Sequence, residues 1–252
     1  MKENLLDIIK KIGDREFNLE YFEEFYRWIL QLHLLHVEKI HEKKAQLVTI
    51  DGMGGSGKDS CIEALCSSQP RIEGFREDDF DPFHRYVRRF WAMLDKKGYN
   101  PLVSAYLIAA GKRYLNEAIL GEKLQDPAKI IVTNRSFLTT IMHSSPAFID
   151  ELLRVYSTFP YMPDVRIVFI CNPDIARQRV LKRGFIGRSD SLEYLKRTYS
   201  LSGNIKNYFP EVKLIDTSNL SIAETAAKVQ ELIQNSCYSS KRAKDLKISP
   251  YY

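Results

Sequence analysis

The chain has 252 residues, 44% of them hydrophobic and 27% charged, which is enough for one domain with a sizeable core. No apolar run approaches the roughly 20 residues that a membrane span needs, and the N-terminus lacks the apolar core of a signal peptide. Four cysteines without a C-x-x-C pair predict reduced thiols in a cytoplasmic protein, and a net charge of +5 spread along the chain favours small anionic ligands over nucleic acid.

The first predicted element is a helix over residues 17–42. Aromatic and aliphatic residues recur there at spacings of three and four, which is typical of an amphipathic helix. Its apolar stripe must be buried, so we expect it to pack on its own domain or on a second subunit in a homodimer. Residues 1–45 are therefore expected to form a helical N-terminal extension.

Beyond residue 45, runs typical of strands alternate with helical patterns. Strands are expected at 46–51, 72–76, 129–133, 165–171 and 212–215, and helices near 58–66, 83–97, 102–121, 174–183 and 190–207. Ser221 and Glu224 form a capping-box pattern before a final helix. This alternation predicts an α/β domain over 46–237 with a five-stranded parallel sheet flanked by helices. A basic, mobile tail is expected over 238–252.

A glycine-rich segment follows the first predicted strand and opens the first helix after it. Residues 52–58 read GMGGSGK and fit the G-x-x-x-x-G-K pattern of a phosphate loop in the strand–helix context that this motif requires. Inward-pointing backbone N–H groups would cradle phosphates, and the lysine would reach the β- and γ-oxygens. The residues expected to bind ATP are Gly52, Gly54, Gly55, Ser56, Gly57, Lys58, Asp59 and Ser60.

The position after Lys58 departs from the usual phosphate loop. A serine or threonine that binds Mg²⁺ normally stands there, whereas this chain has Asp59 followed by Ser60. A carboxylate close to the phosphates is favourable only if the metal lies between them. Either Asp59 or the Ser60 hydroxyl is then the Mg²⁺ ligand, or the site is impaired.

Residues 49–60, TIDGMGGSGKDS, resemble the opening of thymidylate kinases. Three later segments are similar to the same family: KIIVTNR at 129–135, VFICNPDIARQRVLKR at 168–183, and residues 184–199, which resemble the lid and the helix after it. The resemblance covers roughly 46–235. It implies a three-layer P-loop fold and a transfer of the γ-phosphoryl group from Mg²⁺-ATP to a nucleoside monophosphate.

The same resemblance suggests roles for residues outside the phosphate loop. It implies that Arg135 clamps the acceptor phosphate and that Arg183 or Arg188 in the lid stabilises the transferred group. Segment 76–81 follows the second strand, where ligands bind in open parallel sheets. We therefore expect an acceptor contact from Arg76, a catalytic carboxylate from Glu77 and a metal ligand from Asp78. A gapless comparison places Lys112 at a family arginine of the third helix, so Lys112 is a predicted substrate contact, with Arg113 as the neighbouring candidate. Arg177 and Arg179 are expected on a plain helix surface.

Several positions differ from the thymidylate kinase pattern. Gly54 replaces an acid, and Asn134 replaces the aspartate before Arg135. Gly57-Lys58-Asp59 and the residues after the third strand, NRS, instead resemble family-2 polyphosphate kinases. The leading prediction is an ATP-dependent nucleoside monophosphate kinase. The alternatives are a polyphosphate-using nucleotide kinase and a nucleotide-binding protein that has lost the transfer reaction.

Overall fold

The computed structural model describes residues 40–76, 108–109, 111–113, 115–144, 146–184 and 190–245. The predicted helices at 17–42 and 83–97 lie wholly or mostly outside these residues, as do the predicted site residues Glu77, Asp78 and Arg188. The chain divides into two compact units. The sheet unit comprises Gln46–Phe75, Ala128–Arg135 and Pro163–Tyr252, and the remainder forms the helical unit.

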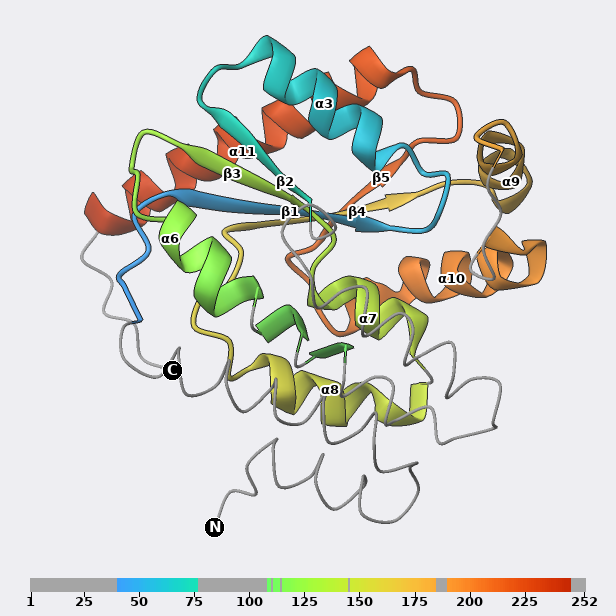
Figure 1. Ribbon diagram of the computed structural model, residues 1–252, viewed down its shortest axis with the longest axis horizontal. Helices are drawn as coiled ribbons and strands as arrows, with labels where there is room; N and C mark the ends of the chain where they lie inside the picture. The colour runs from blue at the N-terminus through green and yellow to red at the C-terminus, as the bar shows by residue number, and fades with distance from the viewer. Residues whose placement is uncertain are drawn as a thin grey trace, which may run out of the picture. The chain divides into compact units, whose positions relative to one another are not determined.

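Five strands form one sheet, which confirms the predicted fold class (Figure 1). They are β1 (Gln46–Gly52), β2 (Ile72–Arg76), β3 (Ile130–Asn134), β4 (Val165–Ile170) and β5 (Lys213–Asp216). Their order is β2-β3-β1-β4-β5, so the strand that leads into the phosphate loop is central. Strands β1 and β3 are almost wholly buried, as expected for a parallel sheet covered on both faces.

The register of the sheet brings distant segments to one edge. Strand β1 pairs in parallel with β3, where Ile50 lies opposite Asn134, and with β4, where Gly52 lies opposite Phe169. Because parallel strands share their direction, the chain leaves β1, β3 and β4 at the same carboxyl edge. The segments that follow these strands are therefore neighbours.

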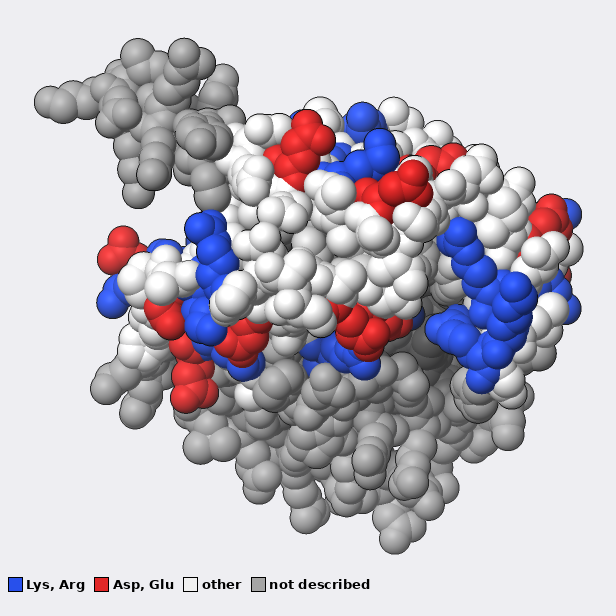
Figure 2. Space-filling model, turned by 90° about the horizontal axis from the view of Figure 1, so that it is seen from above, with Lys and Arg blue, Asp and Glu red and all other residues white. Residues whose placement is uncertain are grey.

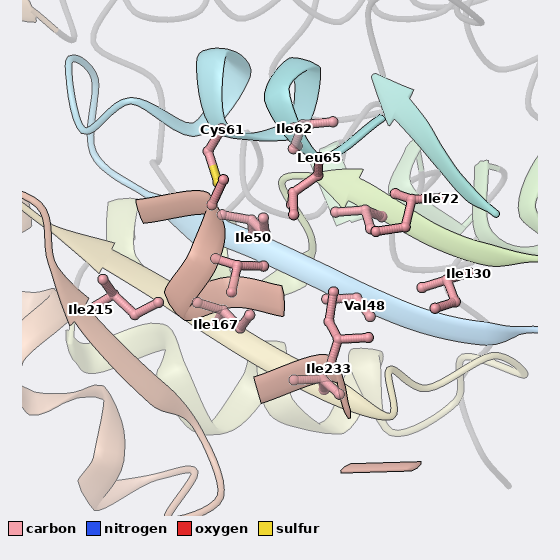
Figure 3. Close-up of a cluster of buried hydrophobic side chains, with 14 of the residues drawn as sticks. Val48, Ile50, Cys61, Ile62, Leu65, Ile72, Ile130, Ile167, Ile215 and Ile233 are labelled. Atoms are coloured by element: carbon pink, nitrogen blue, oxygen red, sulfur yellow. The ribbon is translucent and has the colours of Figure 1, made fainter. Parts of the chain in front are cut away.

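Two helices cover one face of the sheet, α3 (Lys58–Ser68) and α11 (Ile222–Asp245). Alternate residues of the strands, such as Val48 and Ile50 of β1, point toward this face, because successive strand side chains point to opposite sides. They pack against Ile62 and Leu65 of α3 and Ile233 of α11, all essentially buried (Figure 3). The core therefore fixes the helix that begins at the phosphate loop.

Two further helices follow β4, α9 (Pro173–Leu181) and α10 (Leu192–Asn204), with a 3₁₀ turn at Ile205–Asn207. The Asn172 side chain caps α9 by accepting from Asp174 N at 2.9 Å, and Pro173 occupies the first turn, where no backbone donor is needed. Helix α10 packs against α9 and β4. A small cluster of Met53, Cys171, Ala176 and Leu195 ties both helices to the start of the phosphate loop.

The final helix begins as the sequence predicts. Ser221 Oγ accepts from Glu224 N at 3.2 Å and the Glu224 carboxylate accepts from Ser221 N at 2.8 Å, which is a reciprocal capping box. The pKa of Glu224 is lowered because its carboxylate accepts hydrogen bonds from the Ser221 hydroxyl and from the Ser221 N–H. Helix α11 continues as far as Asp245, so the first residues of the expected basic tail are helical. Composition indicates the polarity of this segment but not that it continues the helix.

The described part of the helical unit holds a π-helix at Leu115–Leu120 and the short helix α6 (Gly121–Lys123). It also contains α7 (Phe137–His143), a 3₁₀ turn at Pro146–Phe148 and α8 (Ile149–Tyr156), none of which the sequence pattern predicted. Tyr161 organises this unit, because its backbone pairs with the Asn116 amide while its hydroxyl bonds to His41 N and O at 3.0 Å. Among the described residues, no helix has both the length and the apolarity of a membrane span.

The packing of α3 gives a stability prediction. Leu65 is fully buried against the sheet, so Leu65→Ala should leave a cavity and lower the free energy of unfolding by about 2–5 kcal/mol. Glu63→Ala on the exposed side of the same helix is the matched control and should change it by about 0.5 kcal/mol or less. Urea unfolding measures both, and equal losses would contradict the placement of α3.

Candidate active site

The phosphate loop, residues 53–57, connects the central strand β1 to helix α3 (Figure 1). Gly55 has φ of 75°, and a Cβ there would lie 2.3 Å from the Ala176 carbonyl oxygen, so α9 leaves no room for a side chain. Gly57 has φ of 87° and sits at the N-cap of α3. Both positions need glycine, one for the close approach and both for the left-handed backbone. The spacing of the motif thus encodes the shape of the loop.

The loop is closed by its own polar groups. Ser56 is fully buried, and its hydroxyl donates to the Met53 carbonyl oxygen at 2.9 Å. Met53 in turn is buried in the small cluster beside α9 and α10. The serine therefore holds the turn in shape from within, and the apolar cluster anchors its first residue.

Lys58 lies inside this turn and is only 5% exposed. Its ammonium group donates to the carbonyl oxygens of Gly52 at 3.0 Å and Met53 at 2.8 Å, and to Ser56 Oγ at 3.4 Å. The loop thus supplies acceptors to its own lysine. A bound phosphate would offer stronger, charged acceptors to the same group.

The surroundings of Lys58 lower its pKa to about 7. Burial is the largest cause, because it strips water from the charged form, and the nearby positive charge of Arg135 adds to the effect. Asp59 and Asp51 act in the opposite direction, and Arg183 lowers the pKa slightly further. The group is poised to gain a proton when an anion arrives.

Asp59 and Asn134 are brought into contact. Asn134 ends β3, Asp59 stands in the first turn of α3, and the Asn134 amide donates to the Asp59 carboxylate at 2.5 Å. The amide oxygen of Asn134 is buried and accepts no hydrogen bond from any described residue. Oxygens are the preferred ligands of Mg²⁺, so this pair fits a divalent cation at the edge of the phosphate loop. Ser60, the alternative ligand, is half-buried in the same turn.

Arg135 follows with an unusual backbone. Its φ is 81°, the single positive value of a non-glycine residue among those the structure describes, and such a conformation costs about 1–3 kcal/mol. Two hydrogen bonds, both 3.0 Å long, stabilise this backbone conformation. Arg135 N donates to Ile50 O, and Thr133 Oγ1 donates to Arg135 O. The backbone is thus fixed so that the guanidinium group acts on Lys58.

The segment after α9, which was predicted to form the lid, has an arginine and a carboxylate among its described residues. Arg183 is exposed just after α9, and residues 185–189 lie outside the described part. Asp190 is the first described residue after this gap. If Gly54 carried a Cβ atom, that atom would lie 2.8 Å from a carboxylate oxygen of Asp190. The Asp190 carboxylate therefore lies close to position 54, where the family pattern has an acid. The sequence analysis did not single out Asp190, because its partner lies far away along the chain.

Basic side chains gather at the side of the molecule where α9 lies (Figure 2). Arg177 and Arg179 were expected on a plain helix surface, and for Arg179 this was wrong. Its guanidinium donates to the carbonyl oxygens of Thr217 at 3.0 Å and Ser218 at 3.1 Å. Arg177 reaches the Asp190 carbonyl oxygen at 3.4 Å. Both arginines therefore connect α9 to loops near the site.

Arg76 and Lys112 are the remaining described residues that were predicted to contact the acceptor. Arg76 is the last residue of β2 and is half-buried. Lys112 is 8% exposed and lies in the helical unit, just before the π-helix. Its role as an acceptor contact stays a prediction.

The pKa of Lys58 predicts how nucleotide affinity depends on pH. Above about pH 7 the free site holds a neutral lysine, whereas a triphosphate favours the charged form, so binding must take up a proton. Affinity for metal-free ATP should fall as pH rises from about 7.5 to 9, by at most about tenfold per unit.

Lys58→Arg is the matched control, because arginine stays charged and should flatten the dependence whatever its absolute affinity. Calorimetric titration in two buffers of different ionisation enthalpy counts the protons. A wild-type affinity that is independent of pH would contradict a lowered pKa.

Comparison with known proteins agrees with this geometry. The thymidylate kinase family model matches residues 50–229, from the end of β1 into α11. The chain is 28% identical over 190 residues to a probable thymidylate kinase of Pyrobaculum aerophilum, covering 74% of this chain and 95% of that protein. It is 26% identical over 207 residues to the thymidylate kinase of Leuconostoc citreum, covering 75% and 96%.

A solved structure is similar in fold. The thymidylate kinase of Candida albicans superposes with a TM-score of 0.58 at 16% identity, covering 77% of this chain and 93% of that one. The family match spans the phosphate loop, the Asn134-Arg135 segment and the lid, where the polar groups of the site gather. The chain therefore belongs to the thymidylate kinase family of nucleoside monophosphate kinases.

Proposed function

We propose that this kinase transfers the γ-phosphoryl group of ATP to thymidine monophosphate or a closely related deoxynucleoside monophosphate. The main support for this proposal is that Lys58, Arg135 and the Asp59–Asn134 pair lie together at the carboxyl end of the central strand. The names of the relatives support the choice of acceptor. In the reaction, an oxygen of the acceptor phosphate attacks the γ-phosphorus, and the bond to the bridging oxygen of ADP breaks.

Lys58 binds the β- and γ-phosphate oxygens in this proposal. It exchanges three uncharged acceptors in its own loop for phosphate oxygens, which bind an ammonium group more strongly. Backbone N–H groups of residues 53–57 and the N-terminus of α3 add positive potential at the same place. Phosphoryl transfer needs mainly positioning and charge stabilisation, and these groups supply both.

Arginines complete the charge on either side of the transferred group. Arg135 contacts the acceptor phosphate, and Arg183 with Arg188 covers the γ-phosphate from the lid. The electrostatic effect of Arg135 and Arg183 on Lys58 supports a common neighbourhood for the three cations. Such repulsion destabilises the empty site and is relieved when a polyphosphate binds.

Asp59 and Asn134 hold a magnesium ion in this proposal. The Asn134 amide group contacts the carboxylate of Asp59, and its buried oxygen accepts no hydrogen bond from the part of the chain that the structure describes. A single negative charge in this pair limits repulsion with the triphosphate. The ion, when bound, neutralises charge on the β- and γ-phosphates. Ser60 and Asp78 are further candidate ligands. Glu77, Arg76 and Lys112 serve the acceptor side, the first as catalytic carboxylate and the others as phosphate contacts.

A polyphosphate donor is the second candidate. The Asp59–Asn134 contact favours it, because both residues belong to the segments that resemble polyphosphate kinases. Turnover with ATP or polyphosphate as donor, against a panel of nucleoside monophosphates, separates the two.

We expect ATP with thymidine monophosphate to give the highest kcat/KM, and Lys58→Ala to lower it by about 10²-fold or more. Turnover with polyphosphate but not with ATP would show that ATP is not the phosphate donor. No transfer from either donor, together with tight nucleotide binding, would identify a non-catalytic binding protein.

The Asp59–Asn134 contact predicts how activity changes when the acid and the amide are exchanged between these two positions. Asp59→Asn removes the carboxylate, and Asn134→Asp alone places two carboxylates in contact, so each should lower Mg²⁺-dependent kcat/KM by about tenfold or more. The double variant restores one acid and one amide and should recover part of the loss. Additive losses without recovery would show that the two positions are independent.

A further inference from the structure

Strand β5 ends beside the phosphate loop, although the two are far apart in sequence. The residue after the strand, Thr217, is only 2% exposed. Its hydroxyl donates to the Ser56 carbonyl oxygen at 3.0 Å, across 161 positions of the chain. No function considered above uses this residue.

The contact fixes the orientation of one peptide group. In a planar trans peptide, the carbonyl of Ser56 and the N–H of Gly57 point in opposite directions. Because Thr217 holds the carbonyl oxygen on one side, the N–H of Gly57 must point to the other side of the loop. Ser56 is fully buried, so water cannot easily replace the threonine as donor.

Thr217 is itself held from two directions. Its N–H donates to Ile170 O of the neighbouring strand at 2.9 Å. The Arg179 guanidinium, from α9, spans the carbonyl oxygens of Thr217 and Ser218. A second acceptor, Ile170 O, lies 3.2 Å from the hydroxyl, slightly farther than Ser56 O. The loop after β5 is therefore a rigid support rather than a passive neighbour.

We propose that Thr217 is a positioning residue of the phosphate site. Its hydroxyl sets the 56–57 peptide so that the Gly57 N–H faces the bound phosphates, and Arg179 keeps Thr217 in place. Thr217 touches no reacting atom in this arrangement. Thr217 instead affects the affinity for the phosphate chain by orienting the loop. This role explains why Arg179 of α9 binds the carbonyl oxygens of the turn at Thr217 and Ser218. The inference rests on the proposed nucleotide site for its effect on binding, but not for its effect on the loop.

Thr217→Val tests the inference, since valine keeps the branched shape and loses the donor. We expect its dissociation constant for metal-free ATP to rise about tenfold or more. Thr217→Ser keeps the donor and should restore affinity to within about threefold of the wild type. Thr225→Val is the control, because Thr225 is also buried but donates at the start of α11, to Ser221 O at 2.8 Å. It should lose stability without losing ATP affinity.

Backbone order parameters of Gly55 and Gly57, measured by NMR without nucleotide, separate this inference from the proposed function. They should fall in Thr217→Val and stay at wild-type values in Thr217→Ser. If Thr217→Val does not fold, Arg179→Met is the alternative variant. It removes the hydrogen bonds from Arg179 to the carbonyl oxygens of Thr217 and Ser218, and it should lower the same order parameters to a smaller extent.

Two results would overturn the positioning role. One is a Thr217→Val loop as ordered as the wild type with unchanged ATP affinity, and the other is a serine variant as impaired as the valine variant. A wild-type protein that does not bind ATP would instead reject the nucleotide site, while the order parameters would still decide the role of Thr217.

Discussion

A buried lysine inside its own loop is the interaction on which the site depends. Lys58 gives up its hydration to lie in the turn between β1 and α3, and three loop acceptors and two carboxylates compensate only in part. The cost appears as a pKa near 7. In the proposed function, a bound phosphate chain would supply the negative charge that compensates the buried ammonium group. The unfavourable burial of Lys58 would then be relieved by phosphate binding.

The sheet makes this arrangement possible. With β1 in the centre, its carboxyl end has β3 on one side and β4 on the other, so Asn134 and the helix α9 reach the loop from opposite directions. The strained backbone of Arg135 and the close packing of Gly55 against Ala176 are consequences of the same crowding. Thr217 adds a third support from the end of β5. Each contact joins segments that only a parallel sheet places together.

Much of the fold and part of the site follow from the sequence. All five strands were predicted within one or two residues, because buried parallel strands are short apolar runs, and the glycine spacing located the phosphate loop. The departures of Asp59 and Asn134 from the family pattern can be read from the sequence, whereas their contact is a finding of the structure. Helices α7 and α8 were missed, and so were the roles of Asp190, Arg179 and Thr217. Their contacts depend on tertiary packing between distant segments, which no local pattern records.

Titration of Lys58 distinguishes a buried lysine with a lowered pKa from an ordinary one. Carbon-13 labelled lysine allows its side-chain resonance to be followed by NMR across pH, with Lys58→Arg used to assign it. The account predicts a pKa near 7 in the free protein and a clear rise when ATP is bound. An ordinary lysine pKa of about 10.4 in the free protein, unchanged by ATP, would contradict it.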